Sequence, residues 1–392
     1  MPSISNLFAQ LQQVGSEFIH DYCVVNRAIM PLKDVEKMGR DEFSLKAKLN
    51  MPLKLYKYFP NTMKEEKNDD GQIVLKNYSL EALESNTVFL SSPDQFDDVY
   101  DSDIYVPWPE YAFAMLKQYA QWCDCSVDEC KDADAVSKLL WNKLSIAISN
   151  GKRVESAFAL AAKQEKEALH IKLLCTEIEI GLASGYSLST AIVLAIQKLY
   201  GYFIDTIRNI FRVACFTTSP FSQLMWGAAY ANNHRGFCIE YTIDPSNLAY
   251  RQVYYNLFPV IYCNTRKKVT EELLQFQFKD ITAAGHWDVY FNGALRKSFD
   301  WAYQNEWRLL LPGSTDGKYV VNFFKITKVY LGNRMSQKQR REIIEFCHKS
   351  RIPYIGVIRA GDHFEMQECN MLCEDCPRLG NAGEEREYSG GC

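Results

Sequence analysis

Apolar and polar positions alternate along several short stretches of the chain, as expected for β-strands with a buried face. The stretch LKLYKYF at 53–59 alternates in this way and stops before Pro60. A short helical pattern at 79–86 and the apolar run TVFLSS at 87–92 follow it. Further strands are predicted at 212–219, 237–243, 252–263, 306–312, 317–323, 327–332 and 352–360.

Elsewhere, apolar residues recur at intervals of three and four, which is typical of amphipathic helices. Residues 1–50 have this pattern and are predicted to be helical. Residues 105–211 contain several long amphipathic runs with few β-branched clusters, which predicts an all-helical insert. Shorter helices are predicted at 222–233 and 336–349.

These elements predict an α+β fold: a mixed, mainly antiparallel sheet of about eight strands, with helices and an all-helical insert. The pattern divides the chain into four parts. They are N-terminal helices at 1–52, an α+β core at 53–104 plus 212–365, the helical insert at 105–211, and a cysteine-containing C-terminal tail at 366–392.

The composition is that of an ordinary globular protein, with 47% hydrophobic and 23% charged residues. The net charge of −4 does not indicate a nucleic-acid binder, although it leaves room for a local basic patch. The longest apolar run, TAIVLAI at 190–196, is far shorter than a membrane span, and the N-terminus lacks the pattern of a signal peptide. We therefore expect a cytoplasmic protein without a membrane segment, whose 13 cysteines are free thiols.

The first candidate for function is SQLMWGAAYANNHRGFCIEYTI at 222–243. It spaces Trp226, Tyr230 and His234 four residues apart, so on a helix they share one face. In one interpretation the two rings are core, and His234 lies near the negative end of the helix dipole. In the other they form a pocket wall, because Trp and Tyr can stack on a base or a nicotinamide ring. Gly236 is expected to end the helix in a left-handed conformation.

The second candidate is KSFDWAYQNEWRLLL at 297–311, in which Glu306 begins a very apolar strand. One interpretation is a carboxylate at the mouth of the strand that is merely exposed, or that pairs with Arg308 two residues on along the same face. The other is a catalytic carboxylate, held by a rigid strand and partly desolvated by Trp301 and Trp307. Gln304, just before the strand, adds to the second interpretation.

An acidic loop and a cysteine tail are candidates for metal ions. The loop FDDVYDSD at 96–103 does not have the spacing of a calcium-binding EF-hand, so a solvated loop, or one paired with Lys57 and Arg235, is favoured. In the tail, zinc on four thiolates, an iron–sulfur cluster and free thiols remain open. The residues concerned are Asp97, Asp98, Asp101 and Asp103 in the loop and Cys369, Cys373, Cys376 and Cys392 in the tail.

Several of these stretches together resemble a bacterial and phage-associated family catalogued as domain of unknown function 2971. They are LYKYF, TVFLSSPDQFDD, CFTTSPFSQLMWGAAYANNHRGFCIEYTI, a strand ending in Tyr262, and KSFDWAYQNEWRLLL. The resemblance covers residues 53–104 and 212–332. Two positions depart from the family pattern: Phe-Asn-Asp-Pro becomes FDDV at 96–99, and the first Glu of Glu-x-Glu becomes Gln304, a carboxamide that cannot act as a base.

A further likeness is to ADP-ribosyltransferases, through the strand–helix–strand start, the aromatic helix and the Gln-x-Glu pair before a late strand. This likeness implies NAD as the substrate, with Glu306 stabilising the positive charge that develops as nicotinamide leaves. It implies Glu306, Gln304 and His234 as catalytic residues and Lys57, Tyr58, Trp226, Tyr230 and Arg308 as cofactor-binding residues.

The expected function is therefore an NAD-dependent ADP-ribosyltransferase-like enzyme, acting as a toxin or phage-defence effector on a nucleic-acid or protein acceptor. One alternative is a defence effector that binds or processes nucleic acid through the cluster at 226–235. Another is a scaffold whose insert at 105–211 binds an antitoxin or another partner protein. The motifs of nucleotide-binding loops, zinc proteases and hydrolase elbows are absent from the sequence.

Overall fold

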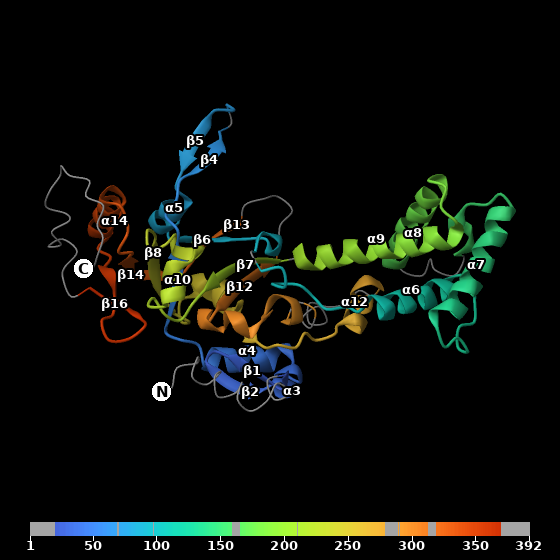
Figure 1. Cartoon of the computed structure of the whole chain (residues 1–392), viewed down its shortest axis with the longest axis horizontal. Helices are drawn as coiled ribbons and strands as arrows, with labels where there is room; N and C mark the ends of the chain where they lie inside the picture. The colour runs from blue at the N-terminus through green and yellow to red at the C-terminus, as the bar shows by residue number, and fades with distance from the viewer. Residues whose placement is uncertain are drawn as a thin grey trace. The chain divides into compact units, whose positions relative to one another are not determined.

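The computed structural model describes residues 20–68, 70–96, 98–158, 165–209, 211–278, 289, 291–312 and 319–369. Its helices and mainly antiparallel sheets confirm the predicted α+β fold class (Figure 1). The chain divides into two compact units. The core unit comprises Met1–Gln95, Phe211–Asn264 and Lys297–Cys392, and the helical unit comprises Phe96–Ile210 and Thr265–Arg296.

A five-stranded sheet with the strand order β16-β15-β14-β8-β3 belongs to the core unit. Its strands are β3 (Lys54–Phe59), β8 (Phe237–Thr242), β14 (Lys325–Leu331), β15 (Tyr354–Arg359) and β16 (Met366–Glu368). β14 and β15 are parallel and are joined by helix α14 (Gln337–Ser350), whereas the other neighbours are antiparallel. α14 begins after Ser336, whose hydroxyl accepts the N–H of Gln339.

Both faces of this sheet are buried, and the alternation along β3 distributes its side chains between them. Leu55 and Phe59 lie in the main apolar core of the unit, together with Phe237 of β8. Tyr56 and Tyr58 lie on the other face, in a smaller cluster rich in aromatic residues. The strand predicted from LKLYKYF is therefore confirmed, with its tyrosines buried as well as its apolar residues.

A three-stranded sheet holds the segment that carries the candidate carboxylate. Its strands are β7 (Phe211–Phe216), β12 (Trp307–Pro312) and β9 (Leu257–Pro259), with β12 in the middle and antiparallel to both neighbours. Every second residue of β12, from Trp307 to Leu311, enters the main core. A bridge between Tyr56 and Thr217 links the end of β7 to β3.

Shorter elements surround these sheets. The strands are β1 (Tyr22–Val25), β2 (Ala28–Pro31), β10 (Ile261–Tyr262) and β11 (Arg296–Lys297) in one sheet, the pair β6 (Thr87–Leu90) and β13 (Tyr319–Asn322), and the pair β4 (Lys64–Lys67) and β5 (Ile73–Lys76). The helices are α3 (Leu32–Glu36), α4 (Arg40–Leu49), α5 (Tyr78–Ser85), α10 (Gln223–Gly227) and α11 (Arg251–Tyr255), with 3-10 turns η1 (Pro93–Gln95), η3 (Ala229–Ala231), η4 (Leu248–Tyr250) and η5 (Phe299–Gln304). The β4–β5 hairpin extends away from the sheets of the core unit (Figure 1).

The prediction that residues 1–52 are helical is wrong for residues 22–31, which form the β1–β2 hairpin. Asn26 and Arg27 at its tip have φ values of 48° and 67°, as a two-residue hairpin turn requires. The β-branched residues Val24 and Ile29 favour strands over helix. α3 and α4 follow the hairpin, and residues 1–19 lie outside the described part of the chain.

The helix predicted at 222–233 begins where expected but is shorter. Ser222 caps α10 by accepting the N–H of Met225, and the helix ends at Gly227. The three residues at 232–234 have φ values of 47°, 51° and 65°, a left-handed conformation that a continuing right-handed helix cannot contain. The residues spaced four apart in this stretch therefore do not share one helical face.

Gly236 is required for close packing and does not take the left-handed conformation predicted for it. A Cβ atom at this position would lie 1.9 Å from the backbone oxygen of Phe59. Only glycine allows the backbone after the left-handed turn to approach β3 this closely.

The helical unit contains the long amphipathic helices that the sequence predicts. They are α6 (Trp108–Trp122), α7 (Ala133–Ser149), α8 (Glu165–Ala183) and α9 (Leu188–Asn209), with the turn η2 (Val154–Ala157) and α12 (Thr270–Phe278). Residues 265–296, assigned above to the α+β core, group with this unit because Leu273, Phe278 and Val289 belong to its apolar core. None of the described helices has both the length and the apolar character needed to span a membrane.

Candidate functional site

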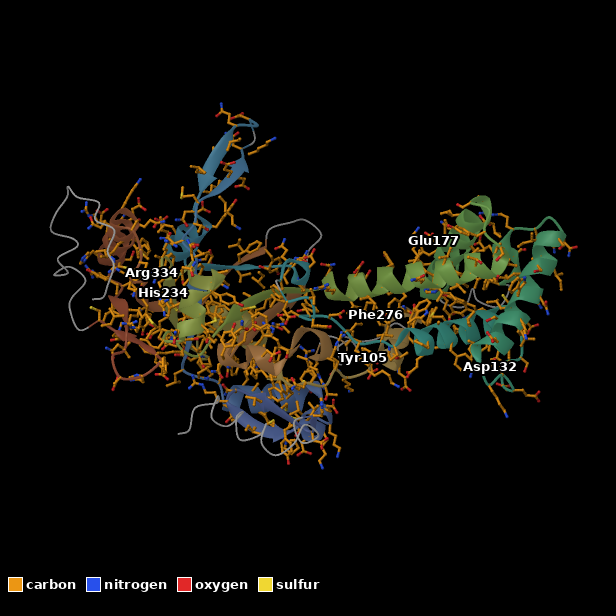
Figure 2. The ribbon with its side chains drawn as sticks, in the orientation of Figure 1. Tyr105, Asp132, Glu177, His234, Phe276 and Arg334 are labelled. Atoms are coloured by element: carbon orange, nitrogen blue, oxygen red, sulfur yellow. The ribbon has the colours of Figure 1, made fainter. Side chains whose placement is uncertain are left out.

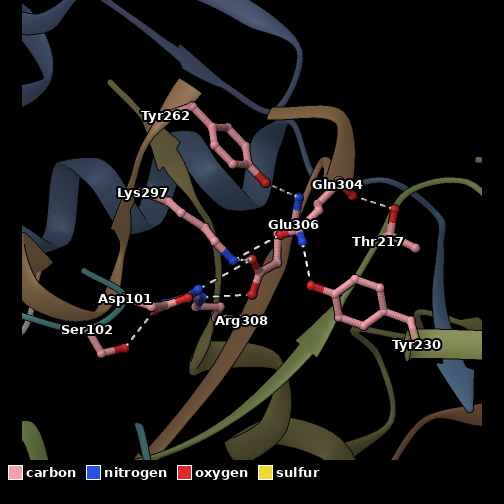
Figure 3. A network of polar contacts seen from close by, with 9 residues as sticks. All are labelled: Asp101, Ser102, Thr217, Tyr230, Tyr262, Lys297, Gln304, Glu306 and Arg308. Carbon is pink, nitrogen blue, oxygen red and sulfur yellow. Dashed lines mark hydrogen bonds and ion pairs between the residues drawn. The ribbon is translucent and has the colours of Figure 1, made fainter. Parts of the chain in front are cut away.

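Glu306, directly before β12, is a buried carboxylate held by two cationic side chains. Its side chain is only 4% exposed. Arg308 donates from Nε to Oε1 at 2.8 Å and from Nη2 to Oε2 at 3.3 Å, and Lys297 Nζ donates to Oε2 at 3.2 Å (Figure 3). The predicted ion pair of Glu306 with Arg308 is confirmed. Burying these charges costs several kcal/mol each, which the direct contacts offset.

Lys297 also joins Glu306 to Gln304. Its Nζ atom lies 3.0 Å from Gln304 Oε1, while Gln304 Nε2 donates to the hydroxyl of Tyr230 at 2.8 Å (Figure 3). Burial raises the pKa of Tyr230 to about 12, so its hydroxyl stays protonated near neutral pH. A carboxylate, a carboxamide and a phenol therefore form one connected polar network.

Side chains from other segments fix the backbone of this network. Thr217 Oγ1 donates to the backbone oxygen of Gln304 at 2.6 Å, and the hydroxyl of Tyr262 accepts the N–H of Glu306 at 2.8 Å. Between these two residues, Asn305 takes a left-handed conformation with φ 44°. This turn ends η5 and directs the chain into β12, so that both side chains reach the same ammonium group.

Lys57 of β3 and Cys215 of β7 lie beside Glu306. Lys57 Nζ donates to the backbone oxygen of Cys215 at 3.1 Å and lies 5.4 Å from the ring centre of Phe216. Burial lowers the pKa of Lys57, against the opposing effect of Cys215 and Glu306. Burial and the carboxylate of Glu306 both raise the pKa of the Cys215 thiol. The thiol is therefore not an activated nucleophile.

Trp226, His234 and Tyr58 lie in the aromatic cluster on the other face of the five-stranded sheet. Trp226 is fully buried, and its Nε1 donates to the backbone oxygen of Pro220 at 2.7 Å. Its ring lies parallel to that of His234 at 6.3 Å and edge-on to that of Tyr58 at 5.2 Å. This placement agrees with the core interpretation of Trp226, because a fully buried ring offers no surface for a ligand to stack on.

His234 contacts Trp226 and Arg334, and its described contacts do not include the network of Glu306. Burial lowers the pKa of His234, and the charge of Arg334 lowers it further. Of the predicted catalytic residues, the structure thus brings together Glu306 and Gln304. His234 belongs to a different part of the core unit.

Two residues of the site were not assigned a role from the sequence. Lys297 begins the stretch KSFDWAYQNEWRLLL, which carries the family resemblance, so the resemblance could have indicated Lys297 as a residue of the site. Cys215 lies opposite Arg308 in the register of β7 and β12, which only the pairing of the strands reveals.

A second buried carboxylate, Glu240 of β8, lies on the face of the five-stranded sheet that carries the aromatic cluster. It accepts hydrogen bonds from Lys54 at 2.8 Å, Thr327 at 2.8 Å, Tyr330 at 3.1 Å and Tyr56 at 3.2 Å. Burial acts to raise its pKa, but the hydrogen bonds, chiefly from Lys54, hold the pKa of Glu240 below its usual value. These four donors satisfy both oxygens of the Glu240 carboxylate.

The acidic loop of the helical unit is less solvated than predicted. Asp101 is buried and accepts the hydroxyl of Ser102 at 2.9 Å. Asp103 pairs with Arg266 of the same unit at 2.6 Å. Asp97 lies outside the described residues.

The cysteine tail lies largely beyond the part of the chain that the structure describes. Cys369 follows β16, where its N–H donates to Gly356 O at 2.8 Å, whereas Cys373, Cys376 and Cys392 fall outside it. Zinc in the tail therefore stays a prediction. Within the described ranges, no group of three or more His, Cys, Asp or Glu residues is arranged to hold a metal ion.

The core unit thus has an α+β fold, in which the buried pair of Glu306 and Gln304 is linked by hydrogen bonds to Tyr230 from a distant segment. Residues 225–309 match the model of a family described as Protein of unknown function (DUF2971). The match confirms the resemblance inferred from the sequence. The matched region contains Tyr230, Lys297, Gln304, Glu306 and Arg308. No curated protein and no solved structure matches the chain.

Proposed function

We propose that the protein is an enzyme that transfers the ADP-ribosyl group of NAD to an acceptor. The observation that carries this proposal is the contact of one ammonium group, Lys297 Nζ, with both Gln304 and Glu306, at 3.0 and 3.2 Å. The contact brings a carboxylate and a carboxamide together in a buried site. A buried, fixed carboxylate can stabilise the positive charge that develops when a glycosidic bond breaks, and a carboxamide beside it can hold an acceptor by hydrogen bonding.

In this reaction the bond between C1 of the ribose and the nicotinamide nitrogen breaks, and its electron pair stays with nicotinamide. Positive charge develops on the ribose, and the Glu306 carboxylate stabilises it in a site that excludes water. A nucleophile of the acceptor then forms the new bond to C1 and releases its proton to the solvent. Gln304 cannot take up this proton, so its part is to orient the acceptor by hydrogen bonding.

The neighbouring residues support this division of roles. Arg308 and Lys297 hold the Glu306 carboxylate in one orientation, and such preorganisation is what electrostatic stabilisation of a transition state requires. The half-buried ring of Tyr230 offers a flat surface next to the pair that suits a nicotinamide ring. Lys57 Nζ, which donates to the backbone oxygen of Cys215 beside the pair, supplies a further hydrogen-bond donor for the same ligand.

The test compares two substitutions that each remove one buried carboxylate from the core unit, Glu306→Gln and Glu240→Gln. The assay is release of nicotinamide from NAD, measured chromatographically with protein and nucleic-acid acceptors present. Loss of a preorganised electrostatic group lowers turnover by about 100-fold or more. We expect this loss for Glu306→Gln, whereas Glu240→Gln should keep the wild-type rate.

Circular dichroism and thermal unfolding are used to check that both variants are folded. A folded Glu306→Gln variant with wild-type nicotinamide release would remove the proposed role of the carboxylate. If the wild-type protein releases no nicotinamide with either class of acceptor, the enzyme proposal itself fails.

A further inference from the structure

The left-handed turn at 232–234 and the segment that leads into α14 form one connected surface of the core unit. The N–H of Arg334 donates to the backbone oxygen of His234 at 3.0 Å, and that of Gly332 donates to Gly236 O at 3.0 Å. The two backbones are so close that a Cβ atom on Gly332 would lie 2.2 Å from His234 O. Figure 2 labels His234 and Arg334 at this place. The backbones of the two segments therefore lie side by side.

The turn itself is held rigidly. Three consecutive non-glycine residues in the left-handed region are costly, and such a conformation persists only where surrounding contacts impose it. Here the N–H of His234 donates to Trp226 O at 2.9 Å and that of Gly236 to Ala231 O at 2.8 Å. The stacking of His234 on the buried Trp226 adds to these contacts. Arg235 thus projects from a fixed backbone.

Four exposed cations belong to these two segments, which we together call the basic surface: Arg235 beside the turn, Arg334, and Lys338 and Arg341 of α14. Among the residues that the structure describes, none of the four has an ion-pair partner. The first turn of α14 carries no acidic residue. Residues 332–351 contain six Lys and Arg but two Glu, although the whole chain has a net charge of −4. Residues 332–351 therefore carry an excess of positive charge, although the net charge of the whole chain is negative.

Exposed cations that lack carboxylate partners attract an anionic ligand. Guanidinium groups match phosphate geometry with paired hydrogen bonds, and three of the four residues are arginines. The positive end of the α14 dipole adds to the same field. Trp226 of α10, on which His234 stacks, is fully buried and cannot stack on a base. Binding here would thus use phosphates and would not read the base sequence.

We propose that the basic surface binds the phosphate backbone of a nucleic acid without sequence preference. This inference rests on the charge and geometry of the surface and does not depend on the proposed transfer reaction. A nucleic acid bound here is also a candidate acceptor for that reaction.

The test is fluorescence anisotropy with 20-nucleotide single-stranded RNA and DNA of mixed sequence at 50 and 200 mM KCl. Four phosphate contacts predict a slope of log affinity against log salt of about −3, so the fourfold rise in salt should weaken binding about 50-fold. Arg235→Gln combined with Arg334→Gln should bring the slope to about −1.5. The matched control, Lys33→Gln combined with Lys37→Gln, removes two exposed charges of the core unit elsewhere and should keep the wild-type slope.

All four substituted residues are exposed, so both double variants should fold, and thermal unfolding checks this. Equal slopes for the wild type and the Arg235/Arg334 variant would overturn the proposal, as would the absence of salt-sensitive binding to either oligonucleotide. Binding to vesicles containing phosphatidylserine, without binding to the oligonucleotides, would assign the surface to membrane headgroups and would also overturn it.

Discussion

The ion pair between Glu306 and Arg308 allows a quantitative test of the site's architecture. Arg308 has no exposed surface, and its guanidinium group donates two hydrogen bonds to the buried carboxylate. Arg308→Met keeps much of the apolar volume of the side chain but removes the charge and both donors. The carboxylate would then remain in a site of low dielectric constant without its bidentate partner.

Removing one partner from a buried ion pair costs about 3–5 kcal/mol, because the remaining charge stays desolvated. We expect the Arg308→Met variant to lose about this much stability in the core unit. Replacing both partners, Arg308→Met with Glu306→Leu, should restore at least half of the loss, since the Glu306 carboxylate is no longer left without Arg308. The restoration would be incomplete because Lys297 would lose its contact with Glu306.

The assay is urea titration followed by hydrogen exchange of peptides from β7 and β12, which reports the core unit separately from the helical unit. Lys46→Ala is the control, since the exposed ion pair of Lys46 with Glu42 should contribute less than about 1 kcal/mol. An Arg308→Met variant within about 1 kcal/mol of the wild type would refute the reasoning. So would a double variant whose loss equals the sum of the two single losses.

Three further predictions concern packing, pH and helix capping. Gly236→Ala should destabilise the core unit by about 3 kcal/mol in urea titration, because the added methyl group would lie 1.9 Å from Phe59 O. Gly227→Ala is the control and should cost less than about 1 kcal/mol, because its added methyl group has no atom within 4 Å. Equal losses of stability for the two variants would contradict this prediction. Burial lowers the pKa of His170 to about 3, below its unfolded value of about 6.5, so the unfolded state takes up the proton first and stability falls as the pH drops. The helical unit should therefore lose about 2 kcal/mol between pH 7.5 and 5, and His170→Phe should abolish this loss in denaturant titrations at the two pH values. Asp132→Ala should cost the helical unit about 1 kcal/mol by urea titration, because the Asp132 carboxylate caps α7 by accepting an N–H at 2.8 Å; an unchanged midpoint would show that the cap contributes nothing.

Local periodicity predicted those features that depend on residues two to four positions apart. The alternation of LKLYKYF indicated β3, and the spacing of two residues placed Glu306 and Arg308 on one face of β12. The amphipathic runs indicated the helices of the helical unit, because each presents a continuous apolar stripe. The family resemblance came from the same local stretches, and the match at 225–309 confirms it.

The composition of the site was decided by tertiary contacts. Tyr230 reaches Gln304 across 74 residues of sequence, and its ring also packs against the aromatic cluster that contains Trp226. Because α10 ends at Gly227 and a left-handed turn follows, this arrangement does not come from helical spacing.

The left-handed turn at 232–234 itself depends on contacts that no local sequence pattern encodes. Its backbone is fixed by the close approach of Gly236 to β3 and by the hydrogen bond from Arg334 to His234. Propensity reports what a few neighbouring residues prefer by themselves, and here packing against distant strands outweighs it. The sequence by itself therefore determined which strand carries the acid, and the tertiary structure decided which residues surround it.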